Sequence, residues 1–238
     1  IDLTTEGWYF MYYEIHPTEH DVVRDLNSIT PPTSVDMSDV FFEGAILTGD
    51  QIQQEIEEKN IEIVGFDPSR LNENSYNVTL SQTILTYNLL ATEDFVMDIK
   101  NPPDLVSATI SEQYGYILHP EKLYLGSTNE IIHSDVYVPI LTGRSSFGRL
   151  GLNIHQTGNF GDLGYRGTWT LQIRSAFPTK IYPNIAIAQI YFIRPYGKIK
   201  KLYSGKYQNS DQPTPSRIYS EIEHIRKSNI NYTDEESR

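Results

Sequence analysis

Residues 136–173 have the sequence VYVPILTGRSSFGRLGLNIHQTGNFGDLGYRGTWTLQI. The stretch begins with an apolar run at residues 136–141 and ends with a second run at residues 168–173. Glycines and polar residues, which are common in turns, fill the segment between the two runs. This arrangement predicts short strands joined by irregular loops.

Other short apolar or β-branched runs lie on both sides of this stretch. They comprise residues 76–80, 84–89, 116–118, 123–125 and 185–192. Runs of this length at this spacing are typical of a sandwich, barrel or jelly-roll fold. One short helix is also predicted, because Thr48 is a suitable N-cap and Ile52 and Ile56 follow it four residues apart.

The composition agrees with a β-rich protein. The 238 residues include 17 Tyr, 9 Phe, 15 Gly and 13 Pro, a mixture that favours many short strands over long helices. A chain of this length with 39% hydrophobic residues can bury one substantial core. We therefore expect one main domain with extensions.

The charge of the chain restricts its partners. A formal net charge of -12 disfavours the broad basic face that coats nucleic acid, so no nucleic-acid partner is expected. A small phosphorylated ligand needs only a local group of cations and backbone N–H donors. Runs such as residues 185–192 are too short to cross a membrane, so no membrane partner and a cytoplasmic location are predicted.

The sequence contains no cysteine. Disulfides, thiol nucleophiles and zinc sites that use Cys ligands are therefore excluded.

Residues 143–152 form the first candidate ligand site. Arg144, Ser145, Ser146 and Arg149 combine fixed positive charge with hydroxyls on a Gly-containing turn, which suits phosphate oxygens. Taken alone, the same residues favour an exposed basic turn over a ligand site.

Residues 155–167 form the second candidate site, and their glycines predict a hairpin. Asp162 can orient a water molecule or a sugar hydroxyl, and the ring of Tyr165 can pack on a sugar. The alternative is ordinary turn chemistry, because Asp and Gly are favoured in turns.

The order of these motifs resembles the dCTP deaminase family of the dCTP deaminase and dUTPase superfamily. The matching segments include residues 144–146, 148–151, 155–157, 165–167, 170–173, 206–208 and 213–217, together with Asp162. Further matches at residues 126–130, 119–120 and 74–76 extend the resemblance back to Leu47, so that it covers about 170 residues. No single segment is specific, but the ordered set is.

The resemblance implies a fold, an assembly and a ligand. It implies a dUTPase-like distorted β-barrel or jelly roll of the β-clip type, assembled as a homotrimer with active sites between subunits. It also implies dCTP or dUTP as substrate, Mg²⁺ carried on the nucleotide phosphates, and no zinc.

The resemblance also assigns roles to individual residues. Ser145, Arg149, Asp162 and the position of Gln172 would be catalytic. The residues that would contact the substrate are Arg144, Ser146, Gln156, Thr157, Tyr165, Tyr203, Lys206 and Tyr207. Of these, Lys206 and Tyr207 would close over the nucleotide as the C-terminal segment folds across it.

Gln172 departs from the family pattern, which has Glu at this position. Glu takes a proton from water and passes it to the pyrimidine, whereas Gln can form hydrogen bonds but cannot shuttle protons. Asn77 likewise replaces an acidic residue. The departures are compatible with drift in a non-catalytic relative, with adaptation to another nucleotide or, for Gln172, with a designed substitution that traps substrate.

Three segments are therefore predicted. Residues 1–43 form an N-terminal extension, residues 44–217 form the dUTPase-like domain with 197–217 as its closing segment, and residues 218–238 form a charged tail. Two functions remain open at this stage. One is a pyrimidine deoxynucleoside triphosphate hydrolase with impaired deamination, and the other is a catalytically silent nucleotide-binding relative.

Overall fold

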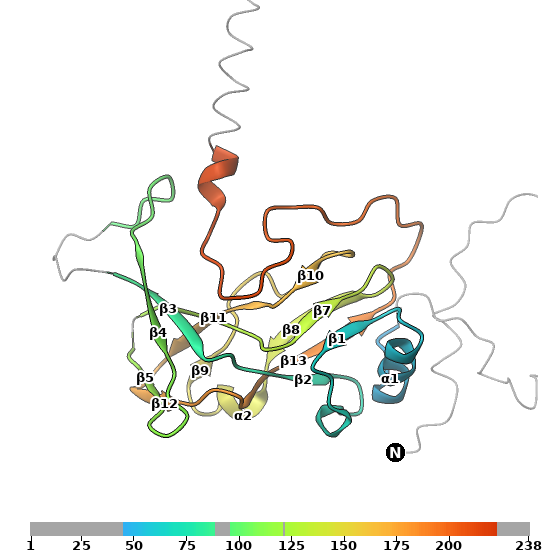
Figure 1. Cartoon of the computed structure of the whole chain (residues 1–238), viewed down its shortest axis with the longest axis horizontal. Helices are drawn as coiled ribbons and strands as arrows, with labels where there is room; N and C mark the ends of the chain where they lie inside the picture. The colour runs from blue at the N-terminus through green and yellow to red at the C-terminus, as the bar shows by residue number, and fades with distance from the viewer. Residues whose placement is uncertain (1–44, 89–95, 121, 223–238) are drawn as a thin grey trace, which may run out of the picture. The chain divides into compact units, whose positions relative to one another are not determined.

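The computed structural model describes residues 45–88, 96–120 and 122–222. Within these residues the fold is mainly β, with few and short helices, as the sequence predicts (Figure 1). The helices are α1 (Gly49–Glu57), η4 (Pro68–Arg70), α2 (Ser145–Gly148) and a helical segment at residues 218–222.

The strands of the first half are β1 (Glu62–Val64), β2 (Tyr76–Thr79), β3 (Thr83–Tyr87), β4 (Leu105–Thr109), β5 (Tyr116–Leu118), β6 (Tyr124–Ser127) and β7 (Ile131–His133). The strands of the second half are β8 (Val138–Gly143), β9 (Leu152–Asn153), β10 (Arg166–Gly167), β11 (Thr170–Ser175), β12 (Thr179–Ile181) and β13 (Ala186–Ile193).

These strands form four antiparallel sheets. Their orders are β1-β7-β10, β4-β3-β6-β11-β9, β12-β5 and β2-β13-β8. Distribution of short strands over several small sheets is the arrangement that the sequence predicts for a barrel-like or jelly-roll-like fold.

The core is built by alternation along the strands. In β11, Leu171 and Ile173 are fully buried, whereas Thr170 and Gln172 lie on the opposite face and are only partly exposed. Successive side chains of a strand point to opposite faces, so one face of β11 packs in the core and the other remains for a ligand. Tyr76 and Phe192 contribute large, fully buried rings to the same core.

Helix α1 confirms the helix predicted at residues 48–56. The Thr48 side chain accepts a hydrogen bond of 3.3 Å from the backbone N–H of Gln51, as an N-cap residue does. Ile52 is fully buried and anchors the helix on the core.

Two local predictions are corrected by the structure. Residues 155–167 form a loop that leads into β10 rather than a hairpin, because β9 pairs with β11 whereas β10 pairs with β7. The basic turn at residues 143–152 contains the one-turn helix α2, which begins after β8.

The predicted N-terminal extension at 1–43 and the last part of the tail, residues 223–238, lie outside the described residues. No helix within the described residues combines the length and the apolar character that a membrane crossing requires.

Candidate active site

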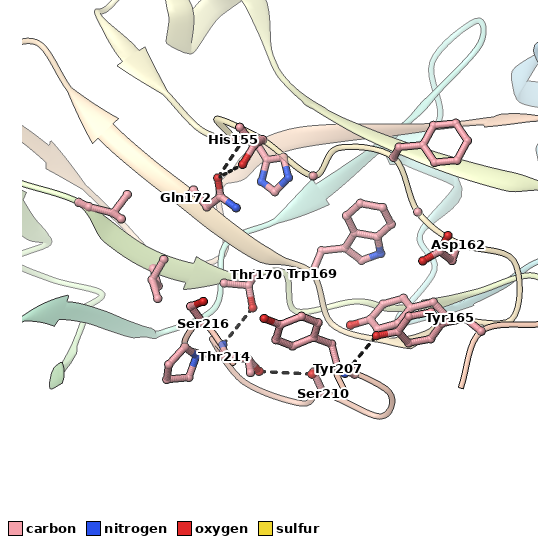
Figure 2. A pocket seen from close by; sticks show the side chains of 18 of the residues that line it. His155, Asp162, Tyr165, Trp169, Thr170, Gln172, Tyr207, Ser210, Thr214 and Ser216 are labelled. Atoms are coloured by element: carbon pink, nitrogen blue, oxygen red, sulfur yellow. Dashed lines mark hydrogen bonds between the residues drawn. The ribbon is translucent and has the colours of Figure 1, made fainter. Parts of the chain in front are cut away.

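A pocket of about 440 Å³ lies over the face of β11 that is turned away from the core (Figure 2). The wall contributed by the sheet and the strand ends consists of Tyr87, Leu123, Leu125, Trp169, Thr170 and Gln172. The loop wall consists of His155, Thr157, Gly158, Phe160, Gly161, Asp162 and Tyr165. The C-terminal segment contributes Tyr203, Tyr207, Ser210, Thr214, Pro215 and Ser216.

Gln172 lies on the floor of this pocket. It pairs with Leu125 of β6 in the antiparallel ladder, and residues directly opposite each other project from the same face. The apolar side chain of Leu125 and the amide of Gln172 therefore stand side by side in the pocket wall.

The amide of Gln172 is held in one orientation. Its Oε1 accepts a hydrogen bond of 3.1 Å from the backbone N–H of Thr157 and one of 3.3 Å from the Thr157 hydroxyl. The loop and β11 are thereby joined at the pocket floor. No other side-chain hydrogen bond of Gln172 is formed within the described part of the chain.

His155 lines the pocket beside Gln172, and sequence reasoning gave it no role. Neither ring nitrogen has a hydrogen-bond partner among the described residues. Burial lowers the pKa of His155, and the backbone of Gly158 opposes this shift in part. The imidazole is therefore neutral at pH 7 and carries one donor and one acceptor. The signal available in the sequence was a His two residues before Thr157.

Aromatic rings form the opposite end of the pocket. The Tyr165 ring makes an edge contact with Trp169 at 6.2 Å between centroids and another with Tyr203 at 5.8 Å. The Tyr165 hydroxyl donates to the carbonyl of Thr168 at 2.7 Å, and burial raises the pKa of this phenol to about 12. Tyr165 thus offers a neutral, fixed ring edge on which a sugar can pack.

Asp162 lies on the loop next to these rings. Its side chain is exposed at the pocket, and its carboxylate forms no hydrogen bond or ion pair with a described residue. Its backbone carbonyl accepts a bond of 3.2 Å from Tyr165 N–H, which fixes the turn. The carboxylate is free to accept a hydrogen bond from a hydroxyl or from a water molecule.

The C-terminal segment closes one side of the pocket. Backbone hydrogen bonds join Tyr203 to Leu163 at 2.7 Å and Thr168 to Ser210 at 2.7 Å. The backbone N–H of Thr214 donates to Thr170 Oγ1 at 3.0 Å, so the segment also contacts β11. These contacts explain why Ser210, Thr214, Pro215 and Ser216 line the pocket, although the sequence analysis places them only in the closing segment and assigns them no substrate contact.

Lys206 does not line the pocket, although Tyr207 does. The Lys206 ammonium forms an ion pair with Glu221, which raises the pKa of Lys206, and it also donates to the Arg217 carbonyl at 3.3 Å. The Tyr207 hydroxyl accepts a bond of 3.0 Å from the Arg217 N–H. Lys206 is therefore bound to the helical segment at 218–222.

The predicted phosphate-binding residues on α2 lie apart from the pocket. Figure 1 shows α2 on the opposite side of the sheets from the C-terminal segment. Arg144 donates to the Ala186 carbonyl at 2.6 Å, whereas Ser145, Ser146 and Arg149 are exposed. Gln156 is also exposed and does not line the pocket.

The structure therefore divides the predicted site into two groups. Those gathered in the pocket are Thr157, Asp162, Tyr165, Gln172, Tyr203 and Tyr207. Those outside it are Arg144, Ser145, Ser146, Arg149, Gln156 and Lys206. Among the described residues that line the pocket, none is Lys or Arg.

Comparison with known proteins identifies close relatives. A family model described as dCTP deaminase-like matches residues 46–194. A "dCTP deaminase, dUMP-forming" of Clostridium beijerinckii is 45% identical over 178 residues, which are 75% of this chain and 99% of the relative. A protein of the same description from Clostridium botulinum is 46% identical over 178 residues, again 75% of this chain and 99% of the relative.

Among solved structures, 2′-deoxycytidine 5′-triphosphate deaminase from Agrobacterium tumefaciens matches with a TM-score of 0.50 at 17% identity. The match covers 64% of this chain and 49% of that chain, and it supports the fold alone. The family model covers more than half of the chain, and the sequence relatives align over nearly their whole length. The chain therefore belongs to the dCTP deaminase-like family.

Proposed function

We propose that this protein binds a pyrimidine deoxynucleoside triphosphate in the pocket over β11 and hydrolyses it, with deamination impaired by Gln172. The observation that carries the proposal is that one pocket gathers Thr157, Asp162, Tyr165 and Gln172, which are separated in sequence. These are positions to which the family resemblance gives contacts with the base, the sugar and the attacking water.

The pocket suits a nucleoside in shape and polarity. Leu123, Leu125 and the Gln172 amide provide an apolar wall with one polar group, which fits the flat face and polar edge of a base. The Tyr165 ring and the Asp162 carboxylate at the other end fit a deoxyribose and its 3′-hydroxyl.

The phosphates need cations, and none of the described residues that line this pocket is Lys or Arg. Exposed Ser145, Ser146 and Arg149 on α2 carry the required donors but lie elsewhere in the same chain. We infer that α2 of a second copy completes the pocket, as a symmetric oligomer allows, and that the assembly is a homotrimer. Arg144 would take part from the same segment.

Mg²⁺ would be held by the nucleotide rather than by a protein cage. Within the described residues no group of three or more His, Asp or Glu side chains is arranged to hold a metal ion. Asp162 is the one carboxylate among the described residues of the pocket wall. A magnesium ion bound to phosphate oxygens would neutralise part of their charge, which is its usual role with nucleotides.

Conversion of dCTP to dUMP, the activity that the relatives' name states, consists of two hydrolytic steps. In one step the 4-amino group of cytosine is replaced by oxygen, and in the other water cleaves the triphosphate to release diphosphate. Gln172 affects the first step, because an amide cannot take a proton from water. Asp162, which remains a carboxylate, can assist the second.

The test measures both steps with purified protein, Mg²⁺ and either dCTP or dUTP, followed by chromatography of the products. We expect conversion of dUTP to dUMP and only slow use of dCTP. Gln172→Glu should raise dCTP conversion by about two to four powers of ten, the usual size of general-base catalysis. Asp162→Asn should reduce the cleavage of dUTP.

A second candidate function is a catalytically silent nucleotide-binding protein, which the absence of a titratable group at Gln172 favours. If neither the wild-type protein nor Gln172→Glu turns over either nucleotide, the hydrolase proposal is wrong. Calorimetric titration with dUTP then decides whether the pocket binds nucleotides at all.

A further inference from the structure

The side-chain amide of Gln172 is held in one of its two possible orientations, because its oxygen must face the hydrogen-bond donors of Thr157. The backbone N–H of Thr157 can only donate, so the atom of Gln172 that faces it at 3.1 Å must be the oxygen. The Thr157 hydroxyl, at 3.3 Å from the same oxygen, acts as a second donor. A flipped amide would place N–H groups against the Thr157 N–H.

The other end of the amide is the Nε2 group, which carries two N–H donors. Gln172 lines the pocket, and no described residue accepts a hydrogen bond from Nε2. Figure 2 shows both bonds on the oxygen of Gln172 and the nitrogen on its other side, turned toward His155 and Trp169. A ligand at the pocket floor therefore meets a donor.

Pyrimidines differ at the group that would meet this donor. Cytosine carries a 4-amino group, which donates, whereas uracil and thymine carry a carbonyl oxygen at C4, which accepts. A donor from Gln172 pairs with the carbonyl and faces the amino group without an acceptor. A carboxylate at this position would present an acceptor to the amino group instead.

The other side chains beside Gln172 do not oppose the preference for a base with a 4-carbonyl group. Both ring nitrogens of His155 are buried and have no hydrogen-bond partner among the described residues, so His155 presents no exposed donor or acceptor to the base. The Thr157 hydroxyl already donates to Gln172. The Leu123 and Leu125 side chains are apolar and contribute no hydrogen bond.

We propose that Gln172 makes the pocket selective for pyrimidine deoxynucleotides with a 4-carbonyl group over cytosine nucleotides, through an amide that Thr157 fixes as a donor toward the base. This inference rests on the proposed function, because it assumes that the base reaches the floor of the pocket. It extends that function by naming the class of base and the group that selects it.

The experiment measures dissociation constants by calorimetry for the non-hydrolysable α,β-imido analogues of dUTP and dCTP, each with Mg²⁺. The wild-type protein should bind the uracil analogue about ten- to a hundredfold more tightly, the usual worth of one matched against one mismatched base contact. Gln172→Met, which has nearly the same shape but no N–H donor and no group that can deaminate the cytosine analogue, should abolish the preference.

Thr157→Ala serves as the matched control. It removes the hydroxyl but keeps the backbone N–H that orients Gln172, so the preference for the uracil analogue should persist. Equal affinity of the wild-type protein for both analogues, or an unchanged ratio in Gln172→Met, overturns the selectivity while leaving nucleotide binding in place. Absence of binding by either analogue overturns the proposed function itself.

Discussion

The pocket over β11 and the α2 segment differ in how their polar side chains are held. In the pocket, Gln172 is fixed by two bonds from Thr157, and Tyr165 is fixed by a bond to the Thr168 carbonyl. On α2, Ser145, Ser146 and Arg149 are exposed and form no side-chain hydrogen bond with a described residue. The pocket is thus already organised within one chain, whereas α2 presents donors that have no partner among the described residues.

This difference in how the side chains are held indicates that the pocket and α2 have separate roles in ligand binding. Side chains that recognise a base must be held in one orientation before the ligand binds, because a hydrogen-bond donor in another orientation does not discriminate between bases. Groups that neutralise phosphates can remain on an exposed turn and be brought to the ligand by assembly.

The largest effect on activity is expected when one copy of the chain is altered in the pocket and another copy is altered at α2. Asp162→Asn alters the pocket and Arg149→Ala alters α2, and each alone should reduce dUTP turnover by about 10²–10³-fold. Co-expression of the two variants should restore about a quarter of the wild-type activity, because half of each region is intact and the copies meet at random.

The control for this experiment is the double variant with both changes in one chain. Its co-expression with either single variant leaves no site in which both regions are intact, so activity should not recover. If co-expressed single variants show no more than the sum of their separate activities, the pocket and α2 do not meet between copies.

A loss of nucleotide affinity of about tenfold is expected from a substitution at Gly167. A Cβ there would lie 2.8 Å from the Ser210 carbonyl oxygen and 2.9 Å from its nitrogen, so Gly167→Ala should push the C-terminal segment off the pocket. Overpacking of this kind costs about 1–3 kcal/mol of unfolding free energy. Calorimetry with a dUTP analogue and thermal unfolding measure the two consequences.

Gly148→Ala is the matched change on α2. A Cβ there meets no atom within 4 Å, so the unfolding free energy should stay within about 0.5 kcal/mol of wild type. A loss of stability equal to that of Gly167→Ala would show that α2 is as tightly packed as the pocket wall.

The sequence predicted β11 and its two faces, because Leu171 and Ile173 alternate with Thr170 and Gln172 in the period of a strand. It did not predict β9 or β10, each of which has only two residues. Such short strands exist because distant partners pair with them, and local propensity carries little information about that pairing.

The sequence likewise predicted only part of the candidate site. Asp162 and Tyr165 were identifiable from their residue types and their position on a Gly-rich segment. The bond from Thr157 to Gln172 depends on how the loop lies over β11, and the contribution of Ser210 depends on a backbone bond to Thr168. Neither follows from composition or periodicity.

The contribution of the pocket wall to folding stability should depend on pH, whereas that of α2 should not. Because burial lowers the pKa of His155, the unfolded chain takes up a proton near pH 6.5 while the folded protein does not. The contribution of His155 to stability is therefore complete above this pH and is lost as pH falls toward the folded-state pKa. Helix α2, with the sequence SSFG, has no group that titrates in this range.

Thermal unfolding of wild type and His155→Gln at pH 8 and at pH 5.5 measures this contribution. The melting temperature of the wild type should fall more between the two pH values than that of the variant, since the remaining titrating groups are shared. Equal changes in the two proteins would contradict a neutral, buried His155.

The smallest effect is expected at the ion pair of Lys206 with Glu221, which decides whether Lys206 belongs to the pocket or to the helical segment at 218–222. The Glu221 side chain is 56% exposed, so the pair contributes at most about 1 kcal/mol to stability. If Lys206 must leave Glu221 to reach a phosphate, Glu221→Gln should tighten binding of a dUTP analogue by up to about fivefold. Lys206→Gln should weaken the same binding and remove any gain from Glu221→Gln in the double variant. An unchanged affinity in Lys206→Gln would instead assign Lys206 to the helical segment alone and leave the phosphates to α2.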